Sequence, residues 1–361
     1  KPSYKKAVDA VKALLGNFKN IEIGLLPEVY PAGDEVVTIY ETTGRVVPPG
    51  KIPIEVGVTV FNVETILNAY YAITKGAGVT HKYITVTGAV KNPITLRVPL
   101  GITVKEVIDL AGGPTIKEYA LINGGPMTGS IAAESDVITK TSNAILVLPP
   151  DQYVIKKRTS NPSISLKRAM SACCQCRMCT DLCPRNLLGH PIEPHRFMRN
   201  ISSGTTNDVK PYLGTFFCCS CGLCEMYSCF QELNPRTLIG IVKGSLRKGG
   251  ISLPEVTEAP VKEERNGRYI LKSRLTAKLG LSEYNRSAPL DETEYKPKSV
   301  KILLSQHIGK PAEAIVKMGD TVKVGDTIAT ADENALGVAI HSSINGMVTE
   351  VTDKYIVVAA E

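Results

Sequence analysis

The chain has 361 residues, with 42 lysines and arginines against 35 aspartates and glutamates, a net charge of +7. This length allows two to four compact domains, since domains usually run to about 100 to 200 residues. Hydrophobic residues make up 43% and charged residues 21%, so wholesale disorder and a fibrous fold are excluded. The positive charge is spread out and no basic stripe is interleaved with aromatic residues, so nucleic-acid binding is not expected.

We expect a soluble, cytoplasmic protein. No stretch approaches the roughly 18 apolar residues needed to span a bilayer, and Lys1 to Lys6 lack the apolar region of a signal peptide. A membrane span is therefore not expected. A helix-like pattern begins at once and no methionine precedes it, so we expect the chain to begin inside a domain.

Residues 1–81 are predicted to form a partial α/β domain, because helical and strand-like patterns alternate. A helix is expected over 3–15 and a second helix follows the YPAGDE loop, while strands are expected over 21–26 and 56–61. The second strand runs into NVETILNAYYAITKG, where Asn62 and Thr65 stand at the start of a helix. Such a junction can bind a phosphorylated cofactor, although plain helix capping by Asn62 explains the same residues.

The remaining segments differ in composition and in predicted secondary structure. Residues 82–150 alternate short β-rich runs with a helix at Val104–Leu110, and predict a small α+β domain. Residues 151–249 are expected to be mainly helical, and 250–298, rich in Glu, Lys and Pro, to be a linker. Residues 299–361 carry V-x-x-G-D-x-V-x-x-G-D-x-I, which predicts a barrel of hairpins like a lipoyl carrier domain. The stretch ADENALG, where such carriers hold their modified lysine, has none, so a swinging arm is not expected.

All ten cysteines lie between positions 173 and 229, which indicates one local thiol-based site. The first run, C-x2-C-x2-C-x3-C followed by proline, has the spacing of a bacterial 4Fe–4S ferredoxin loop. The second run repeats the first two intervals, but four residues precede its last cysteine and no proline follows. A thiolate at every third residue lets a tight loop hold three corners of a cubane cluster. The candidate ligands are Cys173, Cys176, Cys179 and Cys183 in the first run and Cys218, Cys221, Cys224 and Cys229 in the second.

Structural zinc and disulfides are the alternatives. Zinc usually takes two separated C-x2-C pairs, which three consecutive cysteines at this spacing fit poorly. Disulfides need an oxidising compartment, for which the chain shows no targeting signal, and cysteines dispersed over the fold. Two 4Fe–4S clusters are therefore the preferred interpretation.

In two-cluster ferredoxin modules, the fourth cysteine of each run ligates the other cluster. On that pattern, Cys229 completes the cluster of the first run and Cys183 completes the cluster of the second. Cys174 and Cys219 sit at the same offset in each run but outside the three-residue rhythm, so we interpret them as small buried hydrophobic residues.

Two histidines, His190 and His195, lie between the cysteine runs. An imidazole N–H bonded to a cluster sulfur would raise the potential of that cluster. Solvated or helix-capping histidines are the commoner alternative.

The order of these segments resembles a known superfamily. Its members are the flavoprotein subunit of respiratory complex I, the RnfC component of the Rnf electron-transport complex, and the cobalamin reductases of propanediol-utilisation microcompartments. YPAGDE and NVETI look like its FMN-site motifs, and INGGPMTG with ITKTSNAILVLP is similar to its soluble-ligand-binding β-grasp (SLBB) domain. The double cysteine run and a barrel that comes last resemble the cobalamin reductases most.

The resemblance implies a multidomain α/β and α+β protein with a partial Rossmann-like FMN domain, an SLBB-like domain, a helical two-cluster domain and a C-terminal barrel-sandwich domain. It implies NADH as electron donor, FMN, two 4Fe–4S clusters, and corrinoid cobalt or a corrinoid-handling enzyme as acceptor, inside a bacterial microcompartment with a shell protein as neighbour. The family's glycine-rich flavin loop is expected upstream of Lys1, so little FMN is expected in this chain. The expected FMN contacts are Tyr30, Gly33, Asp34, Asn62 and Thr65, with Glu35 near the nicotinamide site.

The resemblance leaves a second function open. The chain is alternatively an electron-relay and docking subunit, without catalytic activity of its own, in a larger membrane-associated complex of the Rnf type.

Overall fold

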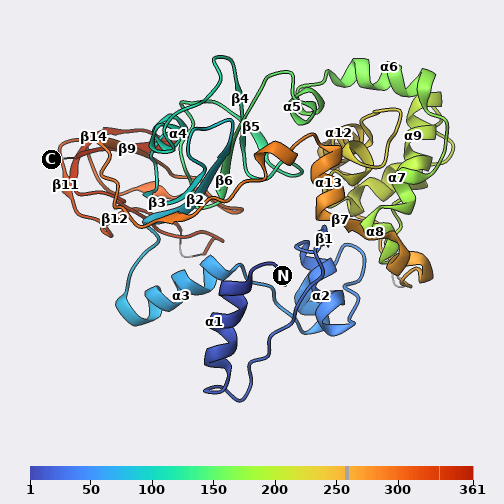
Figure 1. Ribbon diagram of the computed structural model, residues 1–361. Coiled ribbons are helices and arrows are strands. Elements are labelled where there is room, and N and C mark those ends of the chain that lie inside the picture. The colour runs from blue at the N-terminus through green and yellow to red at the C-terminus, as the bar shows by residue number, and fades with distance from the viewer. Residues whose placement is uncertain (257–259, 333, 361) are drawn as a thin grey trace. The chain divides into compact units, whose positions relative to one another are not determined.

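The computed structural model describes residues 1–256, 260–332 and 334–360. Residues 257–259 of the predicted linker and Glu333 of the ADENALG stretch therefore lie outside the described residues. Both helices and sheets contribute to the structure, as Figure 1 shows, and the expectation of a mixed α/β chain is confirmed at this level.

The chain divides into two compact units, and each unit joins two separate stretches of sequence. The first unit comprises Lys1–Val60 and Thr159–Ser282, and the second comprises Phe61–Arg158 and Glu283–Glu361. Helices dominate the first unit and strands dominate the second.

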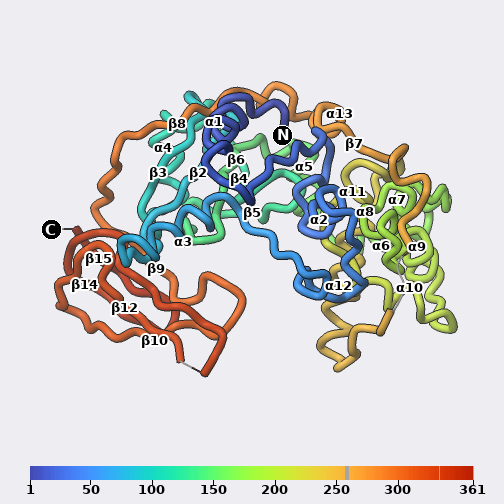
Figure 2. Tube along the Cα trace, turned by 90° about the horizontal axis from the view of Figure 1, so that it is seen from below, coloured from blue at the N-terminus to red at the C-terminus, as the bar shows by residue number. Residues whose placement is uncertain are grey.

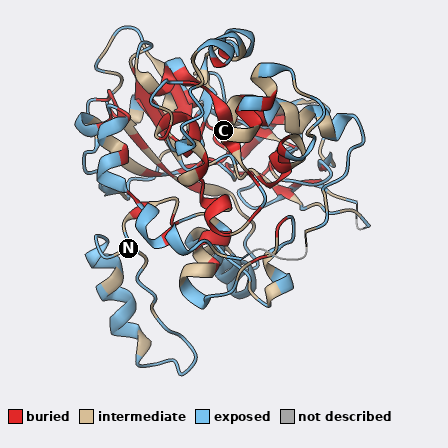
Figure 3. Cartoon of the chain, turned by 90° about the vertical axis from the view of Figure 1, so that its right-hand side faces the viewer, coloured by how far each residue is buried: buried red, intermediate tan, exposed pale blue. Residues whose placement is uncertain are grey.

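Residues 1–60 of the first unit form two of the expected helices. The elements of this stretch are α1 (Lys5–Leu15), β1 (Val29–Tyr30), α2 (Glu35–Thr43) and the 3-10 helix η1 (Pro53–Val56). Every residue of α1 is exposed or half-buried (Figure 3). α2 begins where the Asp34 side chain accepts a hydrogen bond from Val37 N at 3.2 Å, and it ends at Gly44, whose φ of 71° suits glycine.

The strands expected over 21–26 and 56–61 are not formed, and this prediction was wrong. Residues 21–27, all of them described, have no regular secondary structure, and η1 with irregular chain after it occupies the second position. A strand persists only where a neighbour satisfies its backbone groups. In this stretch β1 finds such a neighbour, because it pairs antiparallel with β7 (Ile270–Leu271).

Helices make up most of residues 159–249 of the first unit, within the stretch 151–249 that was expected to be mainly helical. Proline stands in the first turn of several of them, where its missing N–H costs nothing. Their shared core contains Phe197, Met198, Leu238 and Ile239, all buried. The helices are α6 (Pro162–Ala172), α7 (Met178–Asp181), α8 (Pro184–Leu187), α9 (Pro194–Ser203), α10 (Lys210–Leu213), η2 (Gly214–Phe217), α11 (Leu223–Met226) and α12 (Pro235–Lys248).

The segment 250–298, expected to be a linker, contributes to the cores of both units. Its elements are η3 (Glu263–Arg268), β7, α13 (Lys272–Lys278), η4 (Ser282–Tyr284) and β8 (Leu290–Asp291). Within the first unit, Arg265 is buried, pairs with Glu41 and lies over the ring of Tyr40. The polar composition of the segment 250–298 did not indicate this packing, because its buried apolar residues are spaced among charged ones.

The α+β domain predicted for residues 82–150 centres on a six-stranded sheet of order β5-β4-β6-β2-β3-β8. β2 pairs antiparallel with β3 and parallel with β6, and the segment 250–298 supplies the edge strand β8. The further elements of this part of the second unit are α3 (Val63–Lys75), β2 (His81–Gly88), β3 (Ile94–Pro99), α4 (Val104–Leu110), β4 (Ala120–Asn123), β5 (Ser130–Ala132), β6 (Ala144–Leu148) and α5 (Tyr153–Arg158).

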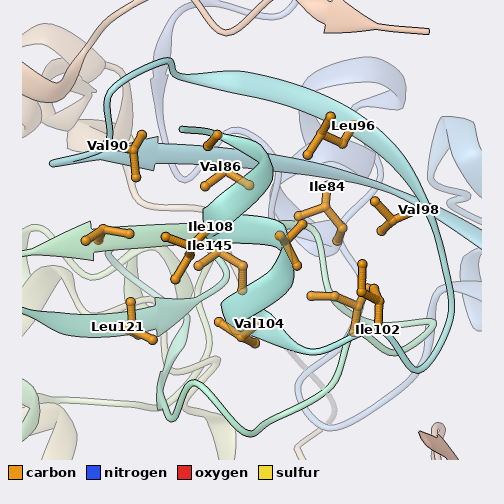
Figure 4. Packing of buried hydrophobic residues seen from close by; sticks show 14 of the residues in the cluster. Ile84, Val86, Val90, Leu96, Val98, Ile102, Val104, Ile108, Leu121 and Ile145 are labelled. Atoms are coloured by element: carbon orange, nitrogen blue, oxygen red, sulfur yellow. The ribbon is translucent and has the colours of Figure 1, made fainter. Parts of the chain in front are cut away.

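α4 closes one face of this sheet, and its bounds match the predicted helix. Thr103 caps it through a reciprocal pair of hydrogen bonds with Glu106. β2 alternates half-buried and buried residues, so Ile84 and Val86 point into the same core as Ile108 of α4 (Figure 4).

The C-terminal residues form two sheets rather than a closed barrel. One has the order β10-β12-β13 and the other β11-β14-β15-β9, and Figure 2 shows these strands gathered in one body. Val300, Ile302, Val348 and Ile356 are among its buried residues. The strands are β9 (Ser299–Leu303), β10 (Glu313–Ala314), β11 (Thr321–Val322), β12 (Thr327–Thr330), β13 (Ile340–His341), β14 (Gly346–Val351) and β15 (Tyr355–Ala360).

The core of the six-stranded sheet makes a stability prediction. Ile145 is fully buried on β6, so Ile145→Ala should cost about 2–5 kcal/mol through lost burial and the cavity left behind. Ile131 on β5 is 42% exposed, and Ile131→Ala should change stability by about 0.5 kcal/mol or less. Native-state hydrogen exchange should therefore quicken in β2 and β6 for the first variant alone. Equal exchange in the two variants would contradict the assigned core.

Candidate functional site

The two cysteine runs fold into loops of the same backbone shape. Gln175 and Ser220 each lie two residues after the first cysteine of a run, and their φ angles are 56° and 57°. Two residues later, Arg177 and Gly222 have φ angles of 67° and 81°, and a short helix starts after each. Positive φ is costly for residues with a side chain, so its repetition at three of these positions points to a functional constraint on the loops.

Each loop borders a cavity, and thiols from both runs line each cavity. The empty space is about 380 Å³ in the first and about 330 Å³ in the second, counting space open to solvent. Among the described residues, no group of three or more His, Cys, Asp or Glu is close enough for a single metal ion. Five cysteines line each cavity. Leaving out Cys174 and Cys219, which lie outside the three-residue rhythm, we call the other four at the first cavity the first cysteine set (Cys173, Cys176, Cys179, Cys229) and the other four at the second cavity the second cysteine set (Cys183, Cys218, Cys221, Cys224).

The last cysteine of each run thus lies at the cavity of the other run. Cys183 is buried and immediately precedes α8, whose first residue is Pro184. Proline fixes the chain direction there, so the helix leaves the first loop instead of closing it. α7 and α11, which follow the two loops, pack against each other. The arrangement is the one expected from the sequence for crossed ligation, which itself stays a prediction.

Hydrogen-bond donors point at three of the cysteine sulfurs. Gln175 Nε2 donates to Cys173 Sγ at 3.1 Å, and Ser220 N donates to Cys218 Sγ at 3.3 Å. Leu233 N donates to the sulfur of Cys229, also at 3.3 Å. Donors to sulfur stabilise thiolates and tune cluster potentials, so these contacts suit an iron–sulfur site.

Burial opposes ionisation of the thiols in the absence of metal. It raises the pKa of Cys179 and of Cys183 to about 12, with the neighbouring cysteines adding to the effect. The pKa of Cys224 is also raised by burial. Thiolates at these positions therefore need a bound cation for compensation, and iron supplies it because a coordinating thiol is deprotonated outright.

Arg185 adds a further sign that the second cavity is built for a group with acceptor atoms. Its Nε is buried and finds no hydrogen-bond partner within the part of the chain that the structure describes. Its guanidinium lines the second cavity and lies against the thiol of Cys219. Cluster sulfurs accept hydrogen bonds, so the residues present fit a 4Fe–4S cluster.

Cys174 and Cys219 depart from the expectation that both are buried. Cys174 is exposed and Cys219 is half-buried, each at the edge of one cavity. A hydrogen bond with Cys221, together with the charge of Arg185, lowers the pKa of Cys219 to about 7. The three-residue rhythm excluded them as ligands, but it could not predict their exposure.

The two histidines have different surroundings. His190 is buried, its Nε2 lies 3.1 Å from Val47 O, and burial lowers its pKa to about 4. His195 lines the first cavity, and its Nδ1 lies 2.8 Å from Thr180 Oγ1. His195 is therefore the histidine placed near a cysteine set, whereas His190 is a packed core residue.

Three of the expected FMN contacts, Tyr30, Gly33 and Asp34, lie in the first unit, as does Glu35, which is expected near the nicotinamide. The Tyr30 hydroxyl donates to Cys221 O at 2.7 Å, which ties this loop to the second cysteine set. Asp34 caps α2 and accepts a hydrogen bond from Arg185 at 3.0 Å. Gly33 and Glu35 are its neighbours in the chain.

The other two expected contacts, Asn62 and Thr65, belong to the second unit. Both are exposed, and Asn62 Oδ1 accepts a hydrogen bond from Glu64 N at 2.9 Å at the start of α3. The capping role that the sequence left open is thus present. Glu64 itself pairs with Lys82 and accepts from Tyr83 N.

Three basic residues at the second cysteine set were missed by the sequence analysis. Arg185 and Arg236 line its cavity, and Lys243 Nζ donates to Cys218 O at 3.0 Å. Arg185 lies in α8 and the other two in α12, among further basic residues, and their spacing carries no signal for a site. The Arg that directly follows the Cys-Pro of the first run was the one available hint.

The chain matches four protein families along its length. Residues 1–71 match the Nuo51 FMN-binding domain and residues 83–130 the SLBB domain. Residues 172–234 match a 4Fe–4S dicluster domain and residues 282–361 the RnfC barrel sandwich hybrid domain. The expected domain content and its order, with the barrel-sandwich domain last, are confirmed.

Two relatives match almost the whole chain. The cobalamin reductase PduS of Citrobacter freundii is 40% identical over 362 residues, 99% of this chain and 79% of its own. The Salmonella typhimurium cobalamin reductase PduS is 40% identical over 359 residues, with the same coverage. A component of the Na⁺-translocating ferredoxin:NAD⁺ oxidoreductase complex of Acetobacterium woodii is 33% identical, over 50% of this chain and 39% of its own.

The cavity linings predict which cysteines are needed for iron. Cys176→Ser and Cys221→Ser each remove one thiol from a cysteine set, so iron should fall from about eight toward four atoms per chain. Cys174→Ser and Cys219→Ser are the matched controls and should retain about eight. Iron and acid-labile sulfide assays on anaerobically purified protein make the comparison. Iron loss in the control variants would show that the ligand sets are misassigned.

Proposed function

The chain belongs to the PduS cobalamin reductase family, and we propose that it passes electrons from NADH through FMN and two 4Fe–4S clusters to the cobalt of a corrinoid. The observation that carries this proposal is the pair of cavities, each lined by thiols of both cysteine runs, in a chain that also matches an FMN-binding family. An FMN-binding domain and a two-cluster domain in one chain make it an electron-transfer oxidoreductase.

The cofactors divide the chemistry between them. When bound, FMN would supply hydride acceptance from NADH, hence two electrons, and the clusters would supply one-electron transfer, which would allow one NADH to reduce a corrinoid cobalt by two single-electron steps. The chain's own residues hold these groups, orient them and set their electrostatic surroundings.

The first cysteine set is proposed to hold one cluster and the second set the other. Three thiols in each set come from one tight loop, and the fourth comes from the segment that leaves the other loop. The sulfur-directed hydrogen bonds and the buried, unpaired Arg185 Nε support this assignment. Crossing ties the two loops into one body, because neither cluster is complete without both.

For the flavin, the proposed contacts remain Tyr30, Gly33, Asp34, Asn62 and Thr65, with Glu35 near the nicotinamide. Their support is the match of residues 1–71 to an FMN-binding family. The hydrogen bond from Tyr30 to Cys221 O adds to it, because a flavin beside Tyr30 would lie next to the second cysteine set.

A relay subunit of an Rnf-type membrane complex is the weaker candidate. The Rnf-type relative from Acetobacterium woodii aligns with only half of this chain. Within the described ranges, no helix is long and apolar enough to cross a bilayer. A corrinoid-handling enzyme as partner, a shell protein as neighbour, and a cytoplasmic place inside a microcompartment stay predictions that follow from the resemblance.

Turnover tests the proposed activity. The full-length protein, purified anaerobically and reconstituted with FMN, should oxidise NADH and reduce cob(III)alamin, and the change in corrinoid absorption follows the reaction. Cys221→Ser should lose most corrinoid reduction, and Cys174→Ser should keep it. Reduction of an artificial acceptor by NADH without reduction of cob(III)alamin, or zinc in place of iron, would contradict the proposal.

Crossed ligation has a separate spectroscopic test. If the sets are as proposed, Cys183→Ser should perturb the EPR signal that Cys221→Ser removes, although Cys183 belongs to the first run. Cys229→Ser should likewise perturb the signal that Cys176→Ser removes. Perturbation within each variant's own run would instead show that the loops close around their own clusters.

A further inference from the structure

Arg185 joins the second cysteine set to the loop that carries Tyr30 and Asp34. One guanidinium nitrogen donates to Asp34 Oδ2 at 3.0 Å, and the side chain lines the second cavity beside Cys219. Because Arg185 comes two residues after Cys183, the same short helix and its cap supply both a thiol and a charge to this cavity.

The ion pair is buried, which magnifies its electrostatic effect. The side chains of Arg185 and Asp34 are 15% and 14% exposed. In such surroundings the effective dielectric constant is well below that of water, so a charge beside a cluster acts on it strongly. A guanidinium keeps its charge at any pH of interest, so the cavity carries a permanent cation.

The charges that face the two cavities differ. At the second cavity, Arg185 and Arg236 line the space and Lys243 bonds Cys218 O, whereas Asp34 and the buried Glu225 oppose them.

At the first cavity, the charged lining residue is Arg177, and it pairs with Asp181 at 3.5 Å. The side chain of Arg177 is 57% exposed, so water screens it. The second cavity therefore has the larger cationic surplus and the weaker screening.

We propose that Arg185, held in place by Asp34, raises the reduction potential of the cluster bound by the second cysteine set. The proposal rests on the two-cluster function proposed above. Reduction adds one electron, and thus one negative charge, to the cluster, and a nearby cation stabilises the reduced form. The negative charge of Asp34 lowers this potential. One ion pair therefore couples the second cluster electrostatically to the loop that is expected to bind flavin.

Two variants with opposite expected shifts test the proposal. Arg185→Gln removes the cation and leaves Asp34 unpaired, so the midpoint potential of the second-set signal should fall. Asp34→Asn removes the anion but still caps α2, since asparagine is a good N-cap, and the same potential should rise. EPR-monitored redox titrations of the reconstituted holoprotein, poised with dithionite, measure the midpoint potential in both variants. The second-set signal is identified as the one that Cys221→Ser removes.

The first-set signal is the internal control and should stay unchanged in both variants. Arg177→Gln is the matched substitution at the first cavity, and it should move only the first-set signal, by a smaller amount because Arg177 is exposed. Structural damage would shift both variants in the same direction, so opposite signs distinguish charge from disruption. Shifts of equal sign, or none in the second-set signal, would overturn the proposal.

If Arg185→Gln fails to bind iron, Asp34→Asn decides alone, and a fall or no change in its second-set potential overturns the proposal. Two EPR-active clusters in the wild-type protein, together with no such shifts in the variants, would refute the role of Arg185 only. Wild-type protein without iron would refute the two-cluster function itself.

Discussion

Each cysteine run gives the first three thiols of its motif to its own cavity and the last thiol to the other, and this exchange ties the two loops together. It requires two helices to leave their loops in defined directions, which Pro184 and the contact between α7 and α11 provide. It also brings buried thiols together whose ionisation is unfavourable without metal. Folding of the loops and binding of iron are therefore coupled, because the metal supplies the charge that the buried sulfurs need.

Local patterns predicted the parts of the molecule whose structure depends on near neighbours. The helix at Val104–Leu110 follows from its capping residues and its apolar spacing, and the cysteine rhythm identified both loops. The strands over 21–26 and 56–61 failed because a strand needs a partner, and alternation of apolar residues does not supply one.

Sequence patterns did not predict contacts between segments that are far apart in the chain. Arg185 and Asp34 are 151 positions apart, and nothing near either residue indicates the other. The segment 250–298 was interpreted as a linker because it is polar, yet β7 pairs with β1 and β8 with β3. The segment thus supplies an edge strand to a sheet in each unit.

The exchange of the last cysteines also bears on how the protein is made. While the chain emerges from the ribosome, the loop of Cys173 is complete long before Cys229 has been synthesised. An iron–sulfur donor that met this nascent loop would find three thiols of the first set and Cys183, whose place is at the other cavity. If the clusters are ligated in the crossed way proposed above, correct loading belongs after translation of both runs, and premature delivery would favour a cluster held by a single loop.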